Sequence, residues 1–111
     1  LESQAAGVAA GLIGSPCAGV DAASRGVIDA AGFGEWFVHR TGHGIGMEAH
    51  EDPYMVAGND TPIAVGHAYS VEPGIYIPGK WGMRLEDIVV ATASGPQPVN
   101  HTNHHLILLD R

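Results

Sequence analysis

The chain has 111 residues, 45% of them apolar, which is the composition of one small folded domain rather than of a disordered segment. The formal net charge is −7 and the five Lys and Arg residues do not cluster, which argues against partners such as nucleic acid or an anionic membrane surface. No apolar run approaches the roughly 20 residues of a membrane span. A single cysteine, Cys17, excludes an intrachain disulfide, so nothing indicates secretion and we expect a cytoplasmic protein.

The N-terminal part of the chain predicts two helices joined by a short turn. Apolar residues at helical spacing predict a helix over residues 3–13, which Pro16 ends. A second helix is expected over residues 22–31, with Asp21 as its N-cap. Two helices connected in this way form a helix hairpin.

From Phe33 onward the sequence changes to short β-rich runs separated by turn residues. A loop rich in Asp, Asn, Gly and Pro is expected over 51–62, and a turn over 78–80. The order of helices followed by strands predicts an α+β fold. The predicted strands and extended segments are 36–39, 68–72, 75–77, 83–93 and 106–109.

Three histidines, His39, His43 and His50, lie within twelve positions of a glycine-rich segment. Histidine is the usual general acid or base near neutral pH and a common metal ligand, and flanking glycines leave room for an ion or a substrate. The spacing Gly-His-Gly-Ile-Gly is not that of a dinucleotide-binding loop. A zincin motif is also excluded, because Pro53 would break the helix that such a motif requires.

Two glutamates occur in predicted strands among apolar neighbours. Glu72 ends the run before Pro73, and Glu86 follows Leu85. A carboxylate in such a position is costly to bury unless it is paired or bound to a cation. Together with His43, the two glutamates form a nitrogen and oxygen ligand set suited to Mn, Co, Fe(II) or Zn. A later histidine cluster is expected to be a solvent-exposed turn; its members are His101, His104 and His105.

Three motifs in this order resemble those of the Xaa-Pro dipeptidases and aminopeptidases. They are the run from Phe37 to Pro53, the run Val71-Glu72-Pro73-Gly74-Ile75-Tyr76, and the run Gly82-Met83-Arg84-Leu85-Glu86-Asp87. These enzymes belong to the methionine aminopeptidase superfamily, whose fold is called pita-bread. The resemblance implies that residues 1–111 are the C-terminal portion of a metallopeptidase catalytic domain. Its fold would be α+β, with the helix hairpin packed on a curved, mainly antiparallel sheet, half of a pita-bread domain. It implies hydrolysis of an Xaa-Pro bond in proline-containing peptides.

The resemblance also assigns roles. His43, Glu72 and Glu86 would be metal ligands, with Glu72 also the proton shuttle and Glu86 the bridging carboxylate. His50 would contact the scissile carbonyl or stabilise the tetrahedral intermediate. His39 would line the pocket for proline. Arg84 would orient a carboxylate or its neighbouring strand.

The chain departs from the family pattern in its number of ligands. The family uses five protein ligands for two divalent ions, Mn, Co or Zn, and two of the five are aspartates upstream of the helix hairpin. With three of the five ligands, we expect this piece to be inactive alone and to bind metal weakly or singly. The missing half should leave apolar faces uncovered, so we expect a homo-oligomer, with Gly7 and Gly11 near a contact.

Two other functions fit parts of the same pattern. A methionine aminopeptidase shares the Gly-His-Gly-Ile-Gly core, although it usually lacks a histidine at the position of His39. A metal-free binding module of the same fold is the other alternative. The intact residues His43, Glu72 and Glu86 argue against it.

Overall fold

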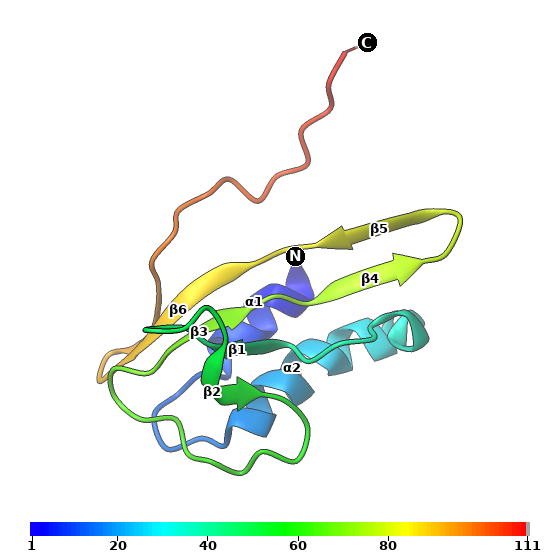
Figure 1. Cartoon of the computed structure of the whole chain (residues 1–111). Helices are drawn as coiled ribbons and strands as arrows, with labels where there is room; N and C mark the ends of the chain where they lie inside the picture. Colours follow the sequence, from blue (N-terminus) through cyan, green and yellow to red (C-terminus); the bar gives the residue numbers. More distant parts are fainter. Residues whose placement is uncertain (111) are drawn as a thin grey trace.

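The computed structural model describes residues 1–110. Two antiparallel helices lie side by side across one face of the strands, and residues 99–110 extend away as coil (Figure 1). The helices are α1 (Glu2–Ala9) and α2 (Cys17–Ala30), followed by a 3₁₀ turn, η1 (Gly34–Trp36). The strands are β1 (Gly42–Gly44), β2 (Glu51–Met55), β3 (Ala68–Val71), β4 (Gly74–Ile77), β5 (Trp81–Arg84), β6 (Asp87–Thr92) and β7 (Gly95–Pro98).

Five strands form one antiparallel sheet in the order β2-β1-β3-β6-β7, so β2 and β7 are its edges. The remaining two strands form a separate β4–β5 hairpin, which projects away from the sheet (Figure 1). This arrangement confirms the predicted α+β fold with a helix pair on an antiparallel sheet. None of the helices in residues 1–110 is long and apolar enough to cross a membrane.

The core lies between the helix pair and the sheet. Alternate residues of β6 are buried, as expected for a strand with one face on a core. Tyr69 and Val71 of β3 and Val20 of α2 are fully buried in the same cluster. Cys17 also lies in this core with no exposed surface, and burial raises the pKa of its thiol, so it is an inert packing residue.

Both predicted helices differ from the observed ones at their ends. The first ends at Ala9 rather than residue 13, because Leu12 and Ile13 are exposed and the chain turns there. The second begins at Cys17, directly after Pro16, whose extended backbone forms the N-cap. Asp21 therefore lies inside α2 and is not a cap.

The strand predictions were correct over 68–72 and 75–77, correct in part over 83–93, and wrong over 36–39 and 106–109. Segment 36–39 contains the end of η1 and irregular chain, and the expected loop over 51–62 begins with strand β2. The expected strand over 83–93 is broken between β5 and β6, and β7 was not predicted. Residues 106–109 form no strand and are exposed, because they have no neighbouring strand to pair with among the described residues.

Candidate metal centre

His43 is held at the middle of β1 by close backbone packing on both sides. A side chain at Gly42 would collide with the backbone carbonyl of Ser70, and one at Gly44 would collide with the backbone at Asp52. Only glycine permits this approach of strands β2 and β3 to β1. The amide N–H of His43 donates a hydrogen bond to Oγ of Ser70 over 3.1 Å. The histidine is buried, with 7% of its surface exposed, and its position is fixed.

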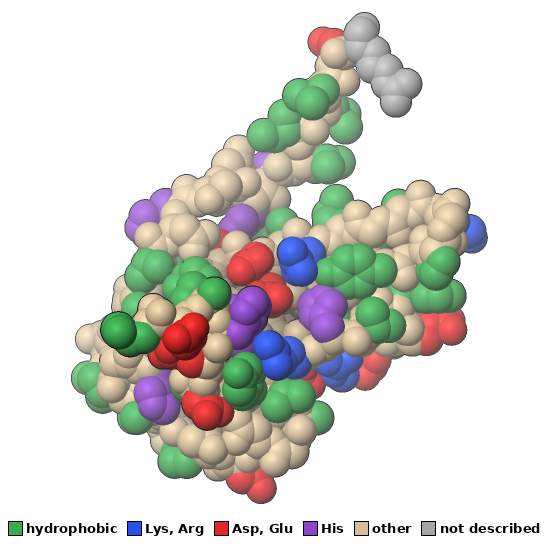
Figure 2. Space-filling model, viewed as in Figure 1, with side chains coloured by type: hydrophobic (Ala, Val, Ile, Leu, Met, Phe, Trp, Pro, Cys, Tyr) green, Lys and Arg blue, Asp and Glu red, His purple; other side chains and the backbone are tan. Residues whose placement is uncertain are grey.

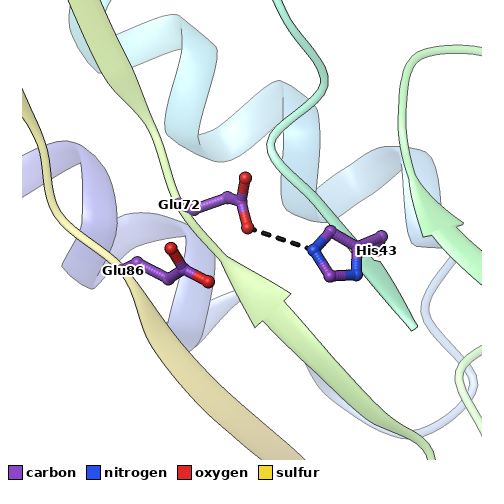
Figure 3. Close-up of side chains that lie close together, drawn as sticks. All are labelled: His43, Glu72 and Glu86. Atoms are coloured by element: carbon purple, nitrogen blue, oxygen red, sulfur yellow. Dashed lines mark ion pairs between the residues drawn. The ribbon is translucent and has the colours of Figure 1, made fainter. Parts of the chain in front are cut away.

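The hydrogen bonds of His43 define which ring nitrogen is free. Nδ1 lies 2.8 Å from the carbonyl oxygen of Gly44, and a carbonyl only accepts, so Nδ1 carries a proton and donates it. In the neutral ring, Nε2 then presents its lone pair, and it lies 3.3 Å from Oε2 of Glu72 (Figure 3). Two acceptor atoms facing each other at this distance need a proton or a metal ion between them. A backbone carbonyl that fixes the outer nitrogen is typical of metal-binding histidines.

Glu72 and Glu86 come from two further segments and point toward the same place (Figure 3). Glu72 directly follows β3, and its side chain is 14% exposed; Glu86 lies between β5 and β6, and its side chain is 42% exposed. One donor atom from each of Glu72, Glu86 and His43 lies within 4.8 Å of the other two. Partial burial and then repulsion from Glu72 raise the pKa of Glu86, against smaller opposing effects of Arg84 and His43.

The donor set fits a divalent cation. A cation between the two carboxylates would remove their repulsion and occupy the free lone pair of the imidazole. One imidazole with two carboxylates, and no thiolate, is the chemistry of Mn, Co, Fe(II) or Zn ligation. The three residues that the sequence predicted as ligands are thus brought together, from sequence positions 43, 72 and 86.

Two of the remaining predicted site residues, His50 and Arg84, lie next to this group. The ring centroid of His50, in the exposed loop between β1 and β2, is 4.2 Å from that of His43. Arg84, at the end of β5, forms a loose ion pair with Glu86, with Nε 3.9 Å from Oε2. Figure 2 shows histidine, acidic and basic side chains gathered on this face of the molecule.

His39 contacts its neighbours in the chain and the β4–β5 hairpin. Its Nδ1 donates to the carbonyl oxygen of Arg40 over 2.7 Å, and its Nε2 accepts from the hydroxyl of Tyr76 over 2.9 Å. The ring of Phe37 meets it edge-on, with centroids 5.2 Å apart. Tyr76 belongs to the second motif, but no role was predicted for it, because the β4–β5 hairpin that carries it to His39 is a tertiary feature.

The expectation for the late histidine cluster is correct for His101 and His105, which are exposed, and wrong for His104. Nε2 of His104 lies 3.0 Å from Oδ2 of Asp87, a buried carboxylate that also accepts a hydrogen bond from Gln4 over 2.6 Å. The side chain of Asn100 is bound to the same carboxylate. Asp87 therefore attaches the segment after β7 to the body of the fold, on the face of the chain opposite to Glu86.

The fold and the three donors together define a class of protein, an α+β domain with an imidazole–carboxylate group that could hold a divalent ion. The model of metallopeptidase family M24 matches residues 1–93, and the chain belongs to that family. The chain is 58% identical to Probable dipeptidase PepE of Mycobacterium tuberculosis over 90 residues. These residues are 81% of this chain and 24% of the relative. It is 46% identical over 107 residues to an Xaa-Pro dipeptidase of Lactobacillus delbrueckii subsp. lactis, covering 96% of this chain and 29% of the relative.

A solved structure agrees with this membership. The crystal structure of dipeptidase PepE from Mycobacterium ulcerans superimposes with a TM-score of 0.93 at 55% identity, over 96% of this chain and 29% of that one. The chain thus spans less than a third of the length of these relatives.

Proposed function

We propose that the longer protein to which this chain corresponds hydrolyses Xaa-Pro peptide bonds, and that His43, Glu72 and Glu86 are metal ligands in it. The observation that carries the proposal is the convergence of these three donors within 4.8 Å from separate segments. The similarity to relatives named dipeptidase and Xaa-Pro dipeptidase supports proline-containing peptides as the substrate class.

In such a reaction each of the candidate site residues would have a separate role. Bound divalent ions would lower the pKa of a water molecule and polarise a carbonyl group. Glu72 would accept a proton from the attacking water and deliver it to the leaving amine. His50, whose ring lies tilted beside that of His43, would donate a hydrogen bond to the oxygen that becomes negative. His39 forms a wall for the proline ring, and Arg84 orients the carboxylate of Glu86.

Three side chains cannot fill the coordination of two ions. We therefore propose that two divalent ions, Mn, Co or Zn, bind in the longer protein, which supplies two further aspartate ligands. This chain would be the C-terminal portion of the catalytic domain. The isolated chain would be inactive and would bind a single ion or bind weakly. Its self-association would follow from faces that the rest of the domain covers.

Titration calorimetry with Mn(II) and Co(II) tests the ligand assignment. The intact chain should bind with micromolar affinity, and His43→Ala and Glu86→Ala should each abolish binding. The matched controls are His101→Ala and Glu35→Ala, which change exposed residues elsewhere and should leave binding intact. Equal binding by the His43→Ala variant would overturn the site, and no binding by the intact chain would overturn a preformed site in this chain.

A substrate comparison tests the reaction. The longer protein, loaded with Mn(II), should cleave an Xaa-Pro dipeptide in preference to a Met-Ala peptide. The reverse preference would identify a methionine aminopeptidase. Loss of metal binding together with absence of cleavage would favour the metal-free binding module.

A further inference from the structure

Asp21 and Arg25 form an ion pair on the inner side of α2, one helical turn apart. Nε of Arg25 lies 3.0 Å from one carboxylate oxygen of Asp21, and an Nη–H group donates to the other oxygen over 3.0 Å. Asp21 is 1% exposed, and the Arg25 side chain is 29% exposed. Taking such charges out of water is costly, and a pair of this kind often adds little net stability. The pair instead fixes the orientation of the guanidinium group, whose planar set of N–H donors can hold several acceptors at once.

Both side chains also hold a separate stretch of backbone. Arg25 donates to the carbonyl oxygens of Phe37 and His39 over 2.8 and 2.7 Å, and its guanidinium lies 4.0 Å above the centroid of the Phe37 ring. Asp21 accepts hydrogen bonds from both the amide N–H and the hydroxyl of Thr41, over 3.0 and 2.8 Å. The pair therefore forms hydrogen bonds with residues 37, 39 and 41, in a segment that belongs to no helix or strand.

This segment is connected to two of the three candidate ligands. It runs directly into His43, two residues beyond Thr41. The carbonyl oxygen of Thr41 accepts the amide N–H of Glu72 over 2.7 Å, so the strand that carries Glu72 is tied to the same point. His39 lies inside the segment. A displacement of the segment would thus move His39, His43 and Glu72 relative to one another.

We propose that Asp21 and Arg25 are positioning residues, which set the distance between His43 and Glu72 and the orientation of His39 from outside the site. The inference rests on the proposed function for the meaning of that distance. The geometry requires arginine at position 25, because lysine keeps the charge but presents no planar fork to bond Asp21, Phe37 and His39 together.

The test uses the 111-residue chain and its Arg25→Lys and Asp21→Asn variants, with Asp29→Asn as the matched control on the exposed side of α2. Ring ¹⁵N signals of His39 and His43, and hydrogen exchange of the Glu72 amide, are recorded without metal. Arg25→Lys and Asp21→Asn should each shift the two histidine signals and speed the hydrogen exchange of the Glu72 amide. Asp29→Asn should do neither. Unchanged signals in a folded Arg25→Lys variant would overturn the proposal.

Affinity for Co(II), normalised to the folded fraction, gives the second measurement. Removing a residue that orients metal ligands weakens binding by about 10- to 100-fold, and we expect Arg25→Lys to lie at the lower end of this range. A purely structural role would lower the unfolding temperature and leave the affinity of folded molecules unchanged. If the intact chain binds no Co(II), a preformed metal site in this chain is overturned, and the histidine signals still decide the positioning role.

Discussion

The hydroxyl of Tyr76 donates a hydrogen bond to Nε2 of His39 over 2.9 Å, and so fixes a ring whose other nitrogen already donates to a backbone carbonyl. Tyr76→Phe should remove this bond, leave Nε2 of His39 without a protein donor, and lower the free energy of unfolding by about 1 kcal/mol. The ring ¹⁵N shifts of His39 report the change directly. Tyr54→Phe is the control, since the ring of Tyr54 stacks on Arg40 and does not contact His39 through its hydroxyl. Identical His39 shifts in both variants would rule out the hydrogen bond.

Substitution by alanine should change the stability of the fold in opposite directions at Gly44 and at Gly26. Gly44→Ala would drive a methyl group into the backbone of β2 and should destabilise the fold by about 1–3 kcal/mol. Gly26→Ala places the methyl in open space on α2 and should stabilise the fold by about 0.4–1 kcal/mol. Urea unfolding measures both. A Gly44→Ala variant as stable as Gly26→Ala would show that β1 is not packed as closely as described.

Asp21 should make the fold sensitive to acid. Burial raises the pKa of Asp21, but the bonds from Arg25 and Thr41 and the charge of Arg25 outweigh it, so the pKa is lowered below 3.8. Because the pKa of Asp21 is lower in the folded than in the unfolded chain, its contribution to stability is fully present above pH 3.8. This contribution is lost as the pH falls through the folded-state pKa. The measurement is the free energy of unfolding between pH 6 and about pH 2. Asp21→Asn should be less stable at pH 6 and should show a flatter decline than Asp29→Asn.

Tyr69 should make the fold sensitive to alkali. Burial, and then the charge of Cys17, raises the pKa of Tyr69 from 10.0 to about 12, so the fold binds the tyrosine proton more tightly than the unfolded chain. Stability is therefore complete below pH 10 and is lost as pH rises toward 12, by about 1 kcal/mol at pH 11.

The Tyr69 hydroxyl is buried without a hydrogen-bond partner among the described residues. Tyr69→Phe removes both the titration and the unsatisfied group, so at pH 7 it should leave stability unchanged or raise it by up to about 1 kcal/mol. The comparison of the two chains by urea unfolding at pH 7 and pH 11 isolates this residue. If both chains lose the same free energy of unfolding between pH 7 and pH 11, a group other than Tyr69 causes the loss.

The sequence predicted the three donors His43, Glu72 and Glu86 because each lies in a short motif whose chemistry is visible in the motif itself. The order of elements was readable for a similar reason, since helix periodicity and strand composition are local properties. Asp21 was misassigned as a cap because α2 begins four residues earlier, at Cys17. Its i,i+4 spacing to Arg25 is visible in the sequence, but its contact with Thr41 depends on how α2 packs. Tertiary contacts of this kind leave no mark in local spacing.

The break between β5 and β6 was missed for another physical reason. The run from Met83 to Ala93 contains several residues that suit strands, but the chain leaves the hairpin and enters the main sheet within it, at the position of Glu86. Composition reports that a residue suits extended backbone and does not report which sheet it joins. The irregular step is what directs Glu86 toward Glu72.

The edge strand β7, Gly95–Pro98, limits how copies of this chain can associate. Val99 donates its N–H inward to Ile88, and in-plane donors alternate along a strand, so the donors of positions 96 and 98 would face outward. Both positions are proline and have no N–H to offer. The opposite edge, β2, carries Pro53 at its centre. A sheet with prolines in both edges resists growth by strand addition, so the self-association proposed for this chain would join apolar surfaces and should yield small discrete assemblies rather than fibrils.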